Sequence, residues 1–283
     1  MTVARIGRPL GGVREEVGKL SAFLRRDLIT AWSYRVDMFS DVFGLFVQAM
    51  LFYFIGLMVD SGKVPSYGGE PASYLEFVAV GIAVGMFVQV AVSKVARAVR
   101  EEQLMGTLES LLLTPTSNAT IQVGSAIYDL LYVPIRTVVF LVIVSTAFDL
   151  RLDPGGLLPA VAILVLFVPF VWGLGVAGAA TIIRVRRGSG LTGFTATLLT
   201  ISAGAYFPLA LLPGWLASAA ALNPFAVALD GMREALLGGG GWSAAGSAAV
   251  VLVPSAIISL GLGYMSFSWA LRRELRRGTL GLY

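Results

Sequence analysis

The sequence predicts an all-α, polytopic membrane protein with six transmembrane helices, and two observations carry this prediction. Of its 283 residues, 57% are hydrophobic and only 13% are charged, whereas soluble domains carry about 25% charged residues. The apolar residues also gather into runs of about 20, the length that crosses a hydrocarbon core about 30 Å thick. Because so little charge cannot cover a chain of this length in water, we expect the bilayer to be its solvent.

Two residue types that often carry chemistry are missing from the sequence. The chain has no cysteine and no histidine, which excludes disulfides, thiolate nucleophiles and the commonest zinc ligand. We therefore expect no catalytic residues, no metal site and no cofactor site in this chain. The net charge of +4 would suit a nucleic-acid partner, but the positions of the charges fit a membrane protein instead.

Residues 1–37 form the first expected unit, a basic N-terminal segment with seven Arg and Lys residues and no apolar signal-peptide run. Its apolar side chains recur at steps of three and four residues: Val13, Val17, Leu20, Phe23, Leu24 and Leu28. This pattern is typical of an amphipathic helix that lies at the inner membrane surface. An ordinary solvated helix is the alternative.

The second unit, residues 38–271, contains the membrane-spanning runs, and the third is a basic cytoplasmic tail, residues 272–283. Polar segments rich in glycine and proline separate several of the runs. The expected spans are 38–59, 74–93, 120–148, 157–183, 191–212 and 245–271.

The distribution of positive charge predicts the topology. If the N-terminus is inside and six spans follow, seventeen of the 21 Arg and Lys residues lie in inside segments and three lie outside. Such an excess marks the cytoplasmic face, so we expect both termini in the cytoplasm and the chain in the cell membrane. A seventh span at 216–237 would place the basic tail outside. We therefore predict that 213–242 is a pair of short helices that enter the outer leaflet and return, which is tolerated where protein buries the backbone.

The longest polar interruption, residues 94–118, has helical character. Val95, Val99, Leu104, Leu108, Leu111 and Leu112 fall roughly on one stripe, and Pro115 ends the pattern because proline disfavours helix at the residue before it. A helix of this kind can rest on the inner membrane surface and offer Glu101, Glu102 and Glu109 to a soluble partner. A solvated intracellular loop is the alternative.

Two segments resemble one known family. The run Glu102-Gln-Leu-Met-Gly106-Thr-Leu-Glu109, followed by Thr114-Pro115, resembles the coupling-helix region of ABC-2 type (type-2 ATP-binding-cassette) exporter permeases. Near the C-terminal end, Tyr206-Phe-Pro208, Leu212-Pro213, Asn223-Pro224 and Asp230-Gly-Met-Arg233 resemble the outward-facing re-entrant segment of the same family. The resemblance covers nearly the whole chain.

The resemblance implies a permease that pairs with a second copy of itself and with two ATP-binding subunits. It assigns the contact with those subunits to Glu101, Glu102, Gly106, Thr107 and Glu109, and the re-entrant segment to Pro208, Pro213, Asn223, Pro224, Asp230 and Arg233. The sequence supports this division, because Gly18-Lys19 and Gly62-Lys63 are followed by Leu and Val rather than by the Ser or Thr of a phosphate-binding loop. ATP and Mg²⁺ are thus expected in the partner, and this chain is not expected to be an enzyme.

Two ionisable residues lie within the third expected span. Asp129 and Arg136 are seven residues apart and share nearly one helical face. Arg136 is about 20 Å from the outer end of that span, counting from Asp149. Intramembrane charges usually face the protein interior or a water-filled cavity. Arg136, with Asp129, is therefore a candidate for the substrate path; a structural pair with Asp129 or snorkelling toward the inner surface is the alternative.

The leading functional hypothesis is export of an amphipathic or hydrophobic compound, such as a drug (as in multidrug efflux), antibiotic or lipid. Polysaccharide export is the alternative within the family, and it would use aromatic side chains ordered along a path. An ion-coupled secondary transporter would favour several intramembrane carboxylates or matching broken helices in two halves. The sequence offers only Asp129 and shows no internal repeat.

Overall fold

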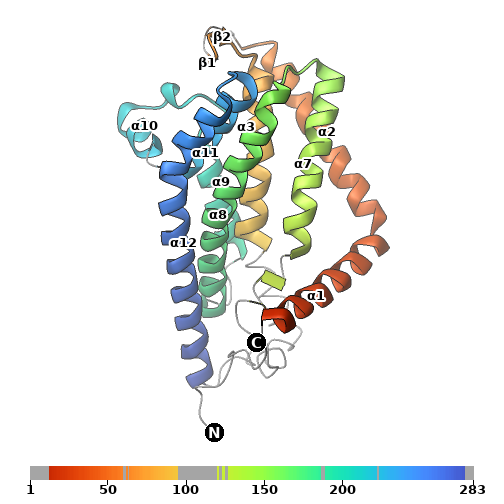
Figure 1. The fold of residues 1–283 in the computed structure, drawn as a ribbon, viewed down its shortest axis with the longest axis vertical. Coiled ribbons are helices and arrows are strands. Elements are labelled where there is room, and N and C mark those ends of the chain that lie inside the picture. The colour runs from red at the N-terminus through yellow and green to blue at the C-terminus, as the bar shows by residue number, and fades with distance from the viewer. Residues whose placement is uncertain are drawn as a thin grey trace.

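Long helices that run side by side make up most of the protein (Figure 1). The computed structural model describes residues 13–59, 62, 64–94, 120, 123–124, 127–185, 189–221 and 223–277.

The N-terminal part contains an elbow of two helices and a short hairpin. Helix α1 (Val13–Ser33) meets α2 (Arg35–Gly56) at Tyr34. The antiparallel strands β1 (Ser66–Tyr67) and β2 (Glu70–Pro71) follow. Helix α3 (Tyr74–Gln89) begins with a capping box, in which Ser73 and Glu76 each accept a hydrogen bond from the other's backbone N–H. It continues into the π-helical segment η3 (Val90–Lys94).

The rest of the chain alternates long helices with short ones. In order, the elements are α7 (Ile127–Phe148), the 3₁₀ turn η4 (Pro154–Gly156), α8 (Leu157–Val185), α9 (Ser189–Ser202), the 3₁₀ turn η5 (Leu209–Leu211), α10 (Gly214–Ala221), α11 (Pro224–Leu237) and α12 (Gly241–Arg277). Prolines lie inside α7, α8 and α12, which membrane helices tolerate better than soluble ones.

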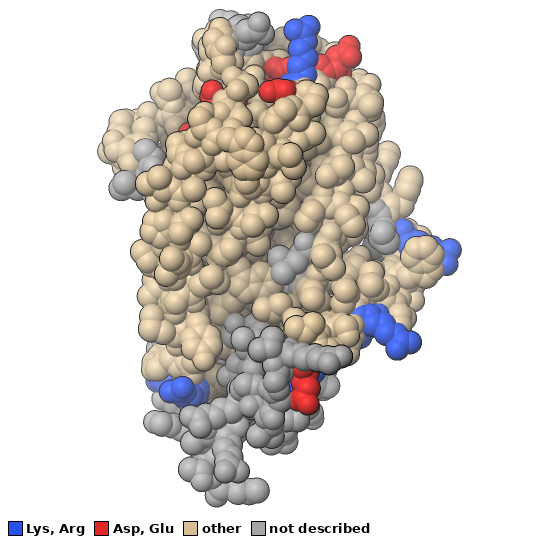
Figure 2. All heavy atoms as spheres, in the orientation of Figure 1, with Lys and Arg blue, Asp and Glu red and all other residues tan. Residues whose placement is uncertain are grey.

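The bundle has two distinct ends. The β1–β2 hairpin lies at one, which we call the hairpin end, and α1 and the last turns of α12 lie at the other, which we call the α1 end (Figure 1). Figure 2 shows charged side chains at the hairpin end, at the end of α12 and along α1 up to its elbow with α2, with a broad uncharged band over the rest of the visible face. This band is what a hydrocarbon layer requires.

Five helices in the described part of the chain are long and apolar enough to cross a membrane: Phe39–Gly56, Tyr74–Val92, Leu131–Phe148, Pro154–Ile182 and Gly241–Arg273. They correspond to the expected spans 38–59, 74–93, 120–148, 157–183 and 245–271. The expected span 191–212 differs, because α9 has 14 residues and ends at Ser202. At 1.5 Å per residue it is about 21 Å long, short of a full crossing. The count of six spans therefore stays a prediction.

A change of backbone direction explains why α9 is short. Gly204 has a φ of +74°, a left-handed conformation that glycine adopts without steric cost. Pro208 then opens the turn Leu209–Leu211, since a proline ring cannot continue the helix hydrogen bonds. The expected run of apolar residues is real, but its local residues break the helix before it completes a span.

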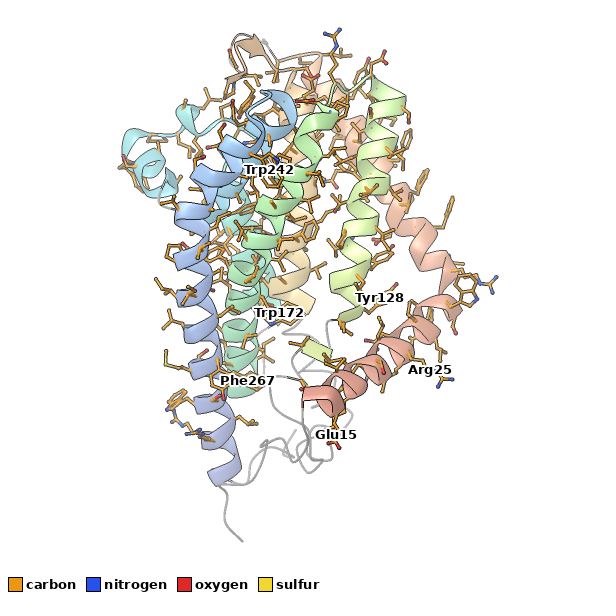
Figure 3. All side chains as sticks on the ribbon, in the orientation of Figure 1. Glu15, Arg25, Tyr128, Trp172, Trp242 and Phe267 are labelled. Atoms are coloured by element: carbon orange, nitrogen blue, oxygen red, sulfur yellow. The ribbon has the colours of Figure 1, made fainter. Side chains whose placement is uncertain are left out.

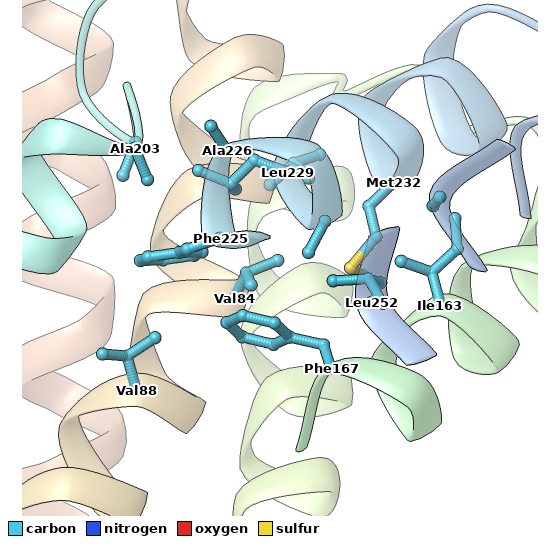
Figure 4. Packing of buried hydrophobic residues seen from close by; sticks show 14 of the residues in the cluster. Val84, Val88, Ile163, Phe167, Ala203, Phe225, Ala226, Leu229, Met232 and Leu252 are labelled. Carbon is cyan, nitrogen blue, oxygen red and sulfur yellow. The ribbon is translucent and has the colours of Figure 1, made fainter. Parts of the chain in front are cut away.

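Burial divides the bundle into a central helix and peripheral ones. In α3, 78% of the spanning window is buried inside the protein, against 11% in α2 and 22% in α7. One apolar cluster joins α3 to α8, α11 and α12, and Figure 4 shows Phe225 of α11 beside Val84 and Phe167 in it. A second cluster joins α3 to α2, α7 and the hairpin. Helix α3 is therefore the shared core of both.

Several glycines lie where two helices or segments approach each other closely. A Cβ on Gly81 of α3 would collide with the backbone carbonyl of Ala205, and one on Gly175 of α8 with that of Ala91 in η3. Gly173 and Gly263 likewise bring the backbones of α8 and α12 together. Small residues at helix contacts let backbones approach closely in membrane proteins.

Candidate functional site

The residues assigned to the ATP-binding partner, Glu101, Glu102, Gly106, Thr107 and Glu109, lie outside the described residues. The described residues on either side of this segment, the end of η3 and Gly124, lie toward the α1 end of the bundle (Figure 1). Gly124 is buried against α1, since a Cβ there would meet the ring of Phe23.

Arg136 of α7 forms an ion pair that the sequence analysis did not anticipate. Its Nη2 lies 3.1 Å from Oδ1 of Asp41 in α2. Tyr132, one helical turn before Arg136, hydrogen-bonds Asp41 and stacks on Tyr128, with ring centroids 5.5 Å apart. These four residues form a polar cluster between α2 and α7, and Tyr128 marks its place near the α1 end (Figure 3). The side chain of Asp129 is not among those described.

The environment of Arg136 supports a structural role. Its side chain is 21% exposed and that of Asp41 is 40% exposed, so the pair lies at the surface of the bundle with apolar neighbours such as Phe39 and Ile135 exposed nearby along the helices. A charge at such a depth is costly unless it is paired, and Asp41 supplies the counter-charge. The Nε atom of Arg136 is buried and has no hydrogen-bond partner among the described groups. A role in the substrate path stays a prediction.

The segment 213–242 contains two short helices, α10 and α11, as expected. Asn223 separates them: its Oδ1 accepts a hydrogen bond from Phe225 N at 3.0 Å, and Pro224 occupies the first turn of α11. Asparagine at the N-cap and proline in the first turn are the residues that a helix start favours. Asn223 also donates from Nδ2 to Ser202 Oγ at 3.3 Å, which ties the start of α11 to the end of α9.

Helix α11 lies inside the bundle rather than on it. Eight of its fourteen residues are buried: Phe225, Ala226, Ala228, Leu229, Met232, Arg233, Ala235 and Leu236. Arg233 is one of the three positive residues that the charge count puts outside the membrane, but its side chain is almost completely buried, at 1% exposure. The signal was present in the sequence, because Arg233 shares a helical face with Leu229, Leu236 and Leu237.

The guanidinium of Arg233 is held by backbone carbonyls from two other segments. Nε and Nη2 donate to Phe77 O of α3 at 3.2 and 3.1 Å. Nη2 also donates to Gly204 O at 3.0 Å and to Ala205 O at 3.3 Å, just beyond α9. Its charge lies 3.6 Å from Oδ1 of the exposed Asp230, and its Cζ is 3.5 Å from the centre of the Phe77 ring. Arg233 therefore joins α11, α3 and the turn after α9.

The hairpin is attached to the same point. Arg233 hydrogen-bonds the side chain of Tyr67 in β1. Burial raises the pKa of Tyr67 to about 12, although the positive charge of Arg233 acts in the opposite direction. The phenol is therefore neutral at physiological pH, and its oxygen accepts from the guanidinium without adding a second buried charge. Arg233 thus connects four segments at the hairpin end: α11, α3, the turn after α9 and strand β1.

A family model described as ABC-2 type transporter matches residues 19–237. The match begins within α1, includes the segment 95–119 and ends with α11. No curated protein matches the chain.

Proposed function

Because the chain belongs to the ABC-2 type transporter family, we propose that it is the permease subunit of an ATP-driven exporter. It moves an amphipathic or hydrophobic compound across the cytoplasmic membrane, and a separate ATP-binding subunit supplies the energy. The observation that carries the proposal is the family match over 219 consecutive positions, from 19 to 237. Within it lie α2, α3, α7 and α8, four of the five helices long enough to span.

The α1 end faces the cytoplasm in this proposal, and the hairpin end faces outside. Seventeen of the 21 Arg and Lys residues fall in segments assigned to the inside, and positive charge in short loops fixes membrane orientation. The amphipathic helix α1 then lies at the inner surface, and Glu101, Glu102 and Glu109 meet the ATP-binding subunit from the same side. Helices α10 and α11 enter from outside and return.

The proposed assembly contains two copies of this chain and two ATP-binding subunits, which hold ATP and Mg²⁺. The low burial of α2 and α7 supports a second copy, because many of their large apolar side chains are exposed in the described part of the chain. A cyclic pair places a path at or beside its two-fold axis. Binding of ATP then shifts the pair between inward- and outward-accessible states through the segment 94–118.

Purification from the native membrane tests the proposal. The affinity-tagged chain, extracted in mild detergent, should bring down an ATP-binding subunit, and the complex should hydrolyse ATP. The chain expressed alone should not hydrolyse ATP. In inverted vesicles the complex should accumulate its compound only when ATP is present. Uptake that follows an ion gradient and ignores ATP would assign the chain to secondary transport instead.

A further inference from the structure

A cavity of about 520 Å³ lies at the hairpin end, between the ends of α2, α3 and α7. A volume of this size is typical of pockets that hold small molecules. Its walls come from the last turn of α2, strand β1, the first turn of α3, the end of α7 and the last residue of α11. None of the candidate residues considered above for coupling or for the substrate path lines it.

Four of the thirteen residues that line the cavity are aromatic. Tyr53 of α2 and Phe148 of α7 lie against each other, with ring centroids 4.9 Å apart. Two further tyrosines have their hydroxyls engaged elsewhere, because Tyr74 donates to Tyr206 O at 3.0 Å and Tyr67 is hydrogen-bonded by Arg233. These four side chains therefore supply mainly ring surface to the cavity, and aromatic rings attract cations through the negative charge of their faces.

The backbone makes the cavity electronegative. Helices α2, α7 and α11 all end at its wall, where Leu57, Phe148 and Leu237 line it. The C-terminus of a helix carries about half a negative charge. The opposing N-terminus of α3 is capped by Ser73 and Glu76, and the negative charge of Glu76 offsets the positive partial charge of that helix end.

The charged side chains act in the same direction. Among the described residues, Glu76 and Asp149 line the cavity together with one cation, Arg151. Glu76 accepts hydrogen bonds from the backbone N–H of Ser73 at 2.7 Å and of Arg151 at 3.3 Å, which fixes its carboxylate at the wall. Figure 2 shows acidic side chains grouped at this end of the molecule.

We propose that this cavity binds an organic cation, such as a protonated or quaternary amine with an apolar body. Glu76, Asp149 and the three helix C-termini stabilise the positive charge, and the rings of Tyr53 and Phe148 pack against the apolar body. A bare metal ion would leave the aromatic wall unused, and an anion would meet two carboxylates. The claim that this cation is the exported compound rests on the proposed function. The claim that a cation binds in this cavity does not depend on that function.

The test measures binding of radiolabelled tetraphenylphosphonium to the full chain in phosphatidylcholine nanodiscs at low salt, with empty discs subtracted. Glu76→Gln keeps the capping box, because glutamine also caps at this position, and removes the charge. It should weaken binding about fivefold to tenfold, as expected for one unit charge a few ångströms away in a partly solvated site. Arg151→Gln should tighten binding by about the same factor, since it removes a repulsive charge.

Asp153→Asn is the matched control. Asp153 caps the turn Pro154–Gly156 by accepting from Gly155 N, a contact that asparagine keeps, and it is not among the residues that line the cavity. We expect less than a twofold change. Tyr53→Leu keeps apolar bulk while removing the ring, and it should weaken binding while the protein still elutes as a single folded species.

The proposal is overturned if the probe binds no better than to empty discs. Equal losses in Glu76→Gln and Asp153→Asn would overturn it too, since they would show a general effect of surface charge. If a neutral sugar such as maltose bound instead, with an affinity unchanged by Glu76→Gln and Arg151→Gln, the cavity would bind an uncharged ligand and the proposal would be wrong. The assay needs no ATP-binding subunit, so its failure and that of the proposed function are distinguishable.

Discussion

Replacing Arg233 by methionine should strongly destabilise the hairpin end. Methionine keeps most of the apolar bulk of the side chain, so the change removes the charge and the donors without opening a large cavity. The carbonyls of Phe77, Gly204 and Ala205 lose the donor that the guanidinium provides. The hydroxyl of Tyr67, which is itself buried, loses its partner as well.

The size of the effect follows from these contacts. A hydrogen bond to a charged group contributes about 1.5–3 kcal/mol to stability. Arg233 donates such bonds to three carbonyls, and one of them, that of Phe77, belongs to helix α3. Removing the arginine also removes a costly buried charge, which offsets part of the loss. We therefore expect a net destabilisation of about 3–5 kcal/mol. Arg233→Lys should lose less, because one ammonium reaches some but not all of these acceptors.

Thermal unfolding in detergent, followed by intrinsic fluorescence or by gel filtration after heating, measures the effect. Asp230→Asn is the control: the side chain of Asp230 is 62% exposed and 3.6 Å from the guanidinium. Because Asp230 is mostly in solvent, its charge adds only about 0–1 kcal/mol to the pair, so the control should unfold much closer to the wild type than Arg233→Met does. If Arg233→Met unfolds at the wild-type temperature, the four-segment attachment is not a source of stability and the reasoning is wrong.

Three further predictions concern the other end of the bundle and the topology. Arg136→Met should lower thermal stability by about 1–2 kcal/mol because it leaves Asp41 unpaired, and adding Asp41→Asn should recover part of the loss; a fall in transport with unchanged unfolding would place Arg136 on the substrate path. Glu102→Lys with Glu109→Lys should weaken assembly with the ATP-binding subunit or uncouple hydrolysis at normal expression, and wild-type coupling would contradict the assignment. A cysteine at Gly278 should react with an impermeant reagent only from the cytoplasmic side, so labelling from outside would refute the topology.

Much of the fold could be predicted from the sequence, because the bilayer imposes a simple rule on span length and apolar composition. The expected spans at 74–93 and 157–183 match α3 with η3 and α8 within a few residues. The break at Asn223-Pro224 was also visible, since both residues are typical of a helix start. These features depend on local sequence and on the solvent.

Features that depend on tertiary contacts could not be predicted in the same way. The pairing of Arg136 with Asp41 joins helices 95 positions apart, and no spacing within one helix reports it. The shortening of α9 depends on the positive φ of Gly204, and this conformation cannot be recognised from the apolar run of 22 residues that contains the glycine. The apolar face of α11 on which Arg233 lies can be recognised in the sequence, but the carbonyls from α3 and from the turn after α9 that bind its guanidinium cannot.

The distribution of burial also bears on how energy would reach the path. Helices α3, α8, α11 and α12 share one apolar cluster and form a body, whereas α1, α2 and α7 form an arm that is largely exposed. The Asp41–Arg136 pair lies within the arm, because it joins α2 to α7, and Arg233 fastens the body to the hairpin. The segment 95–119 connects η3 of the body to α7 of the arm. If the segment 94–118 binds the partner as proposed, a displacement of that segment would be transmitted along the chain to η3 on one side and to α7 on the other, and so to both parts of the bundle.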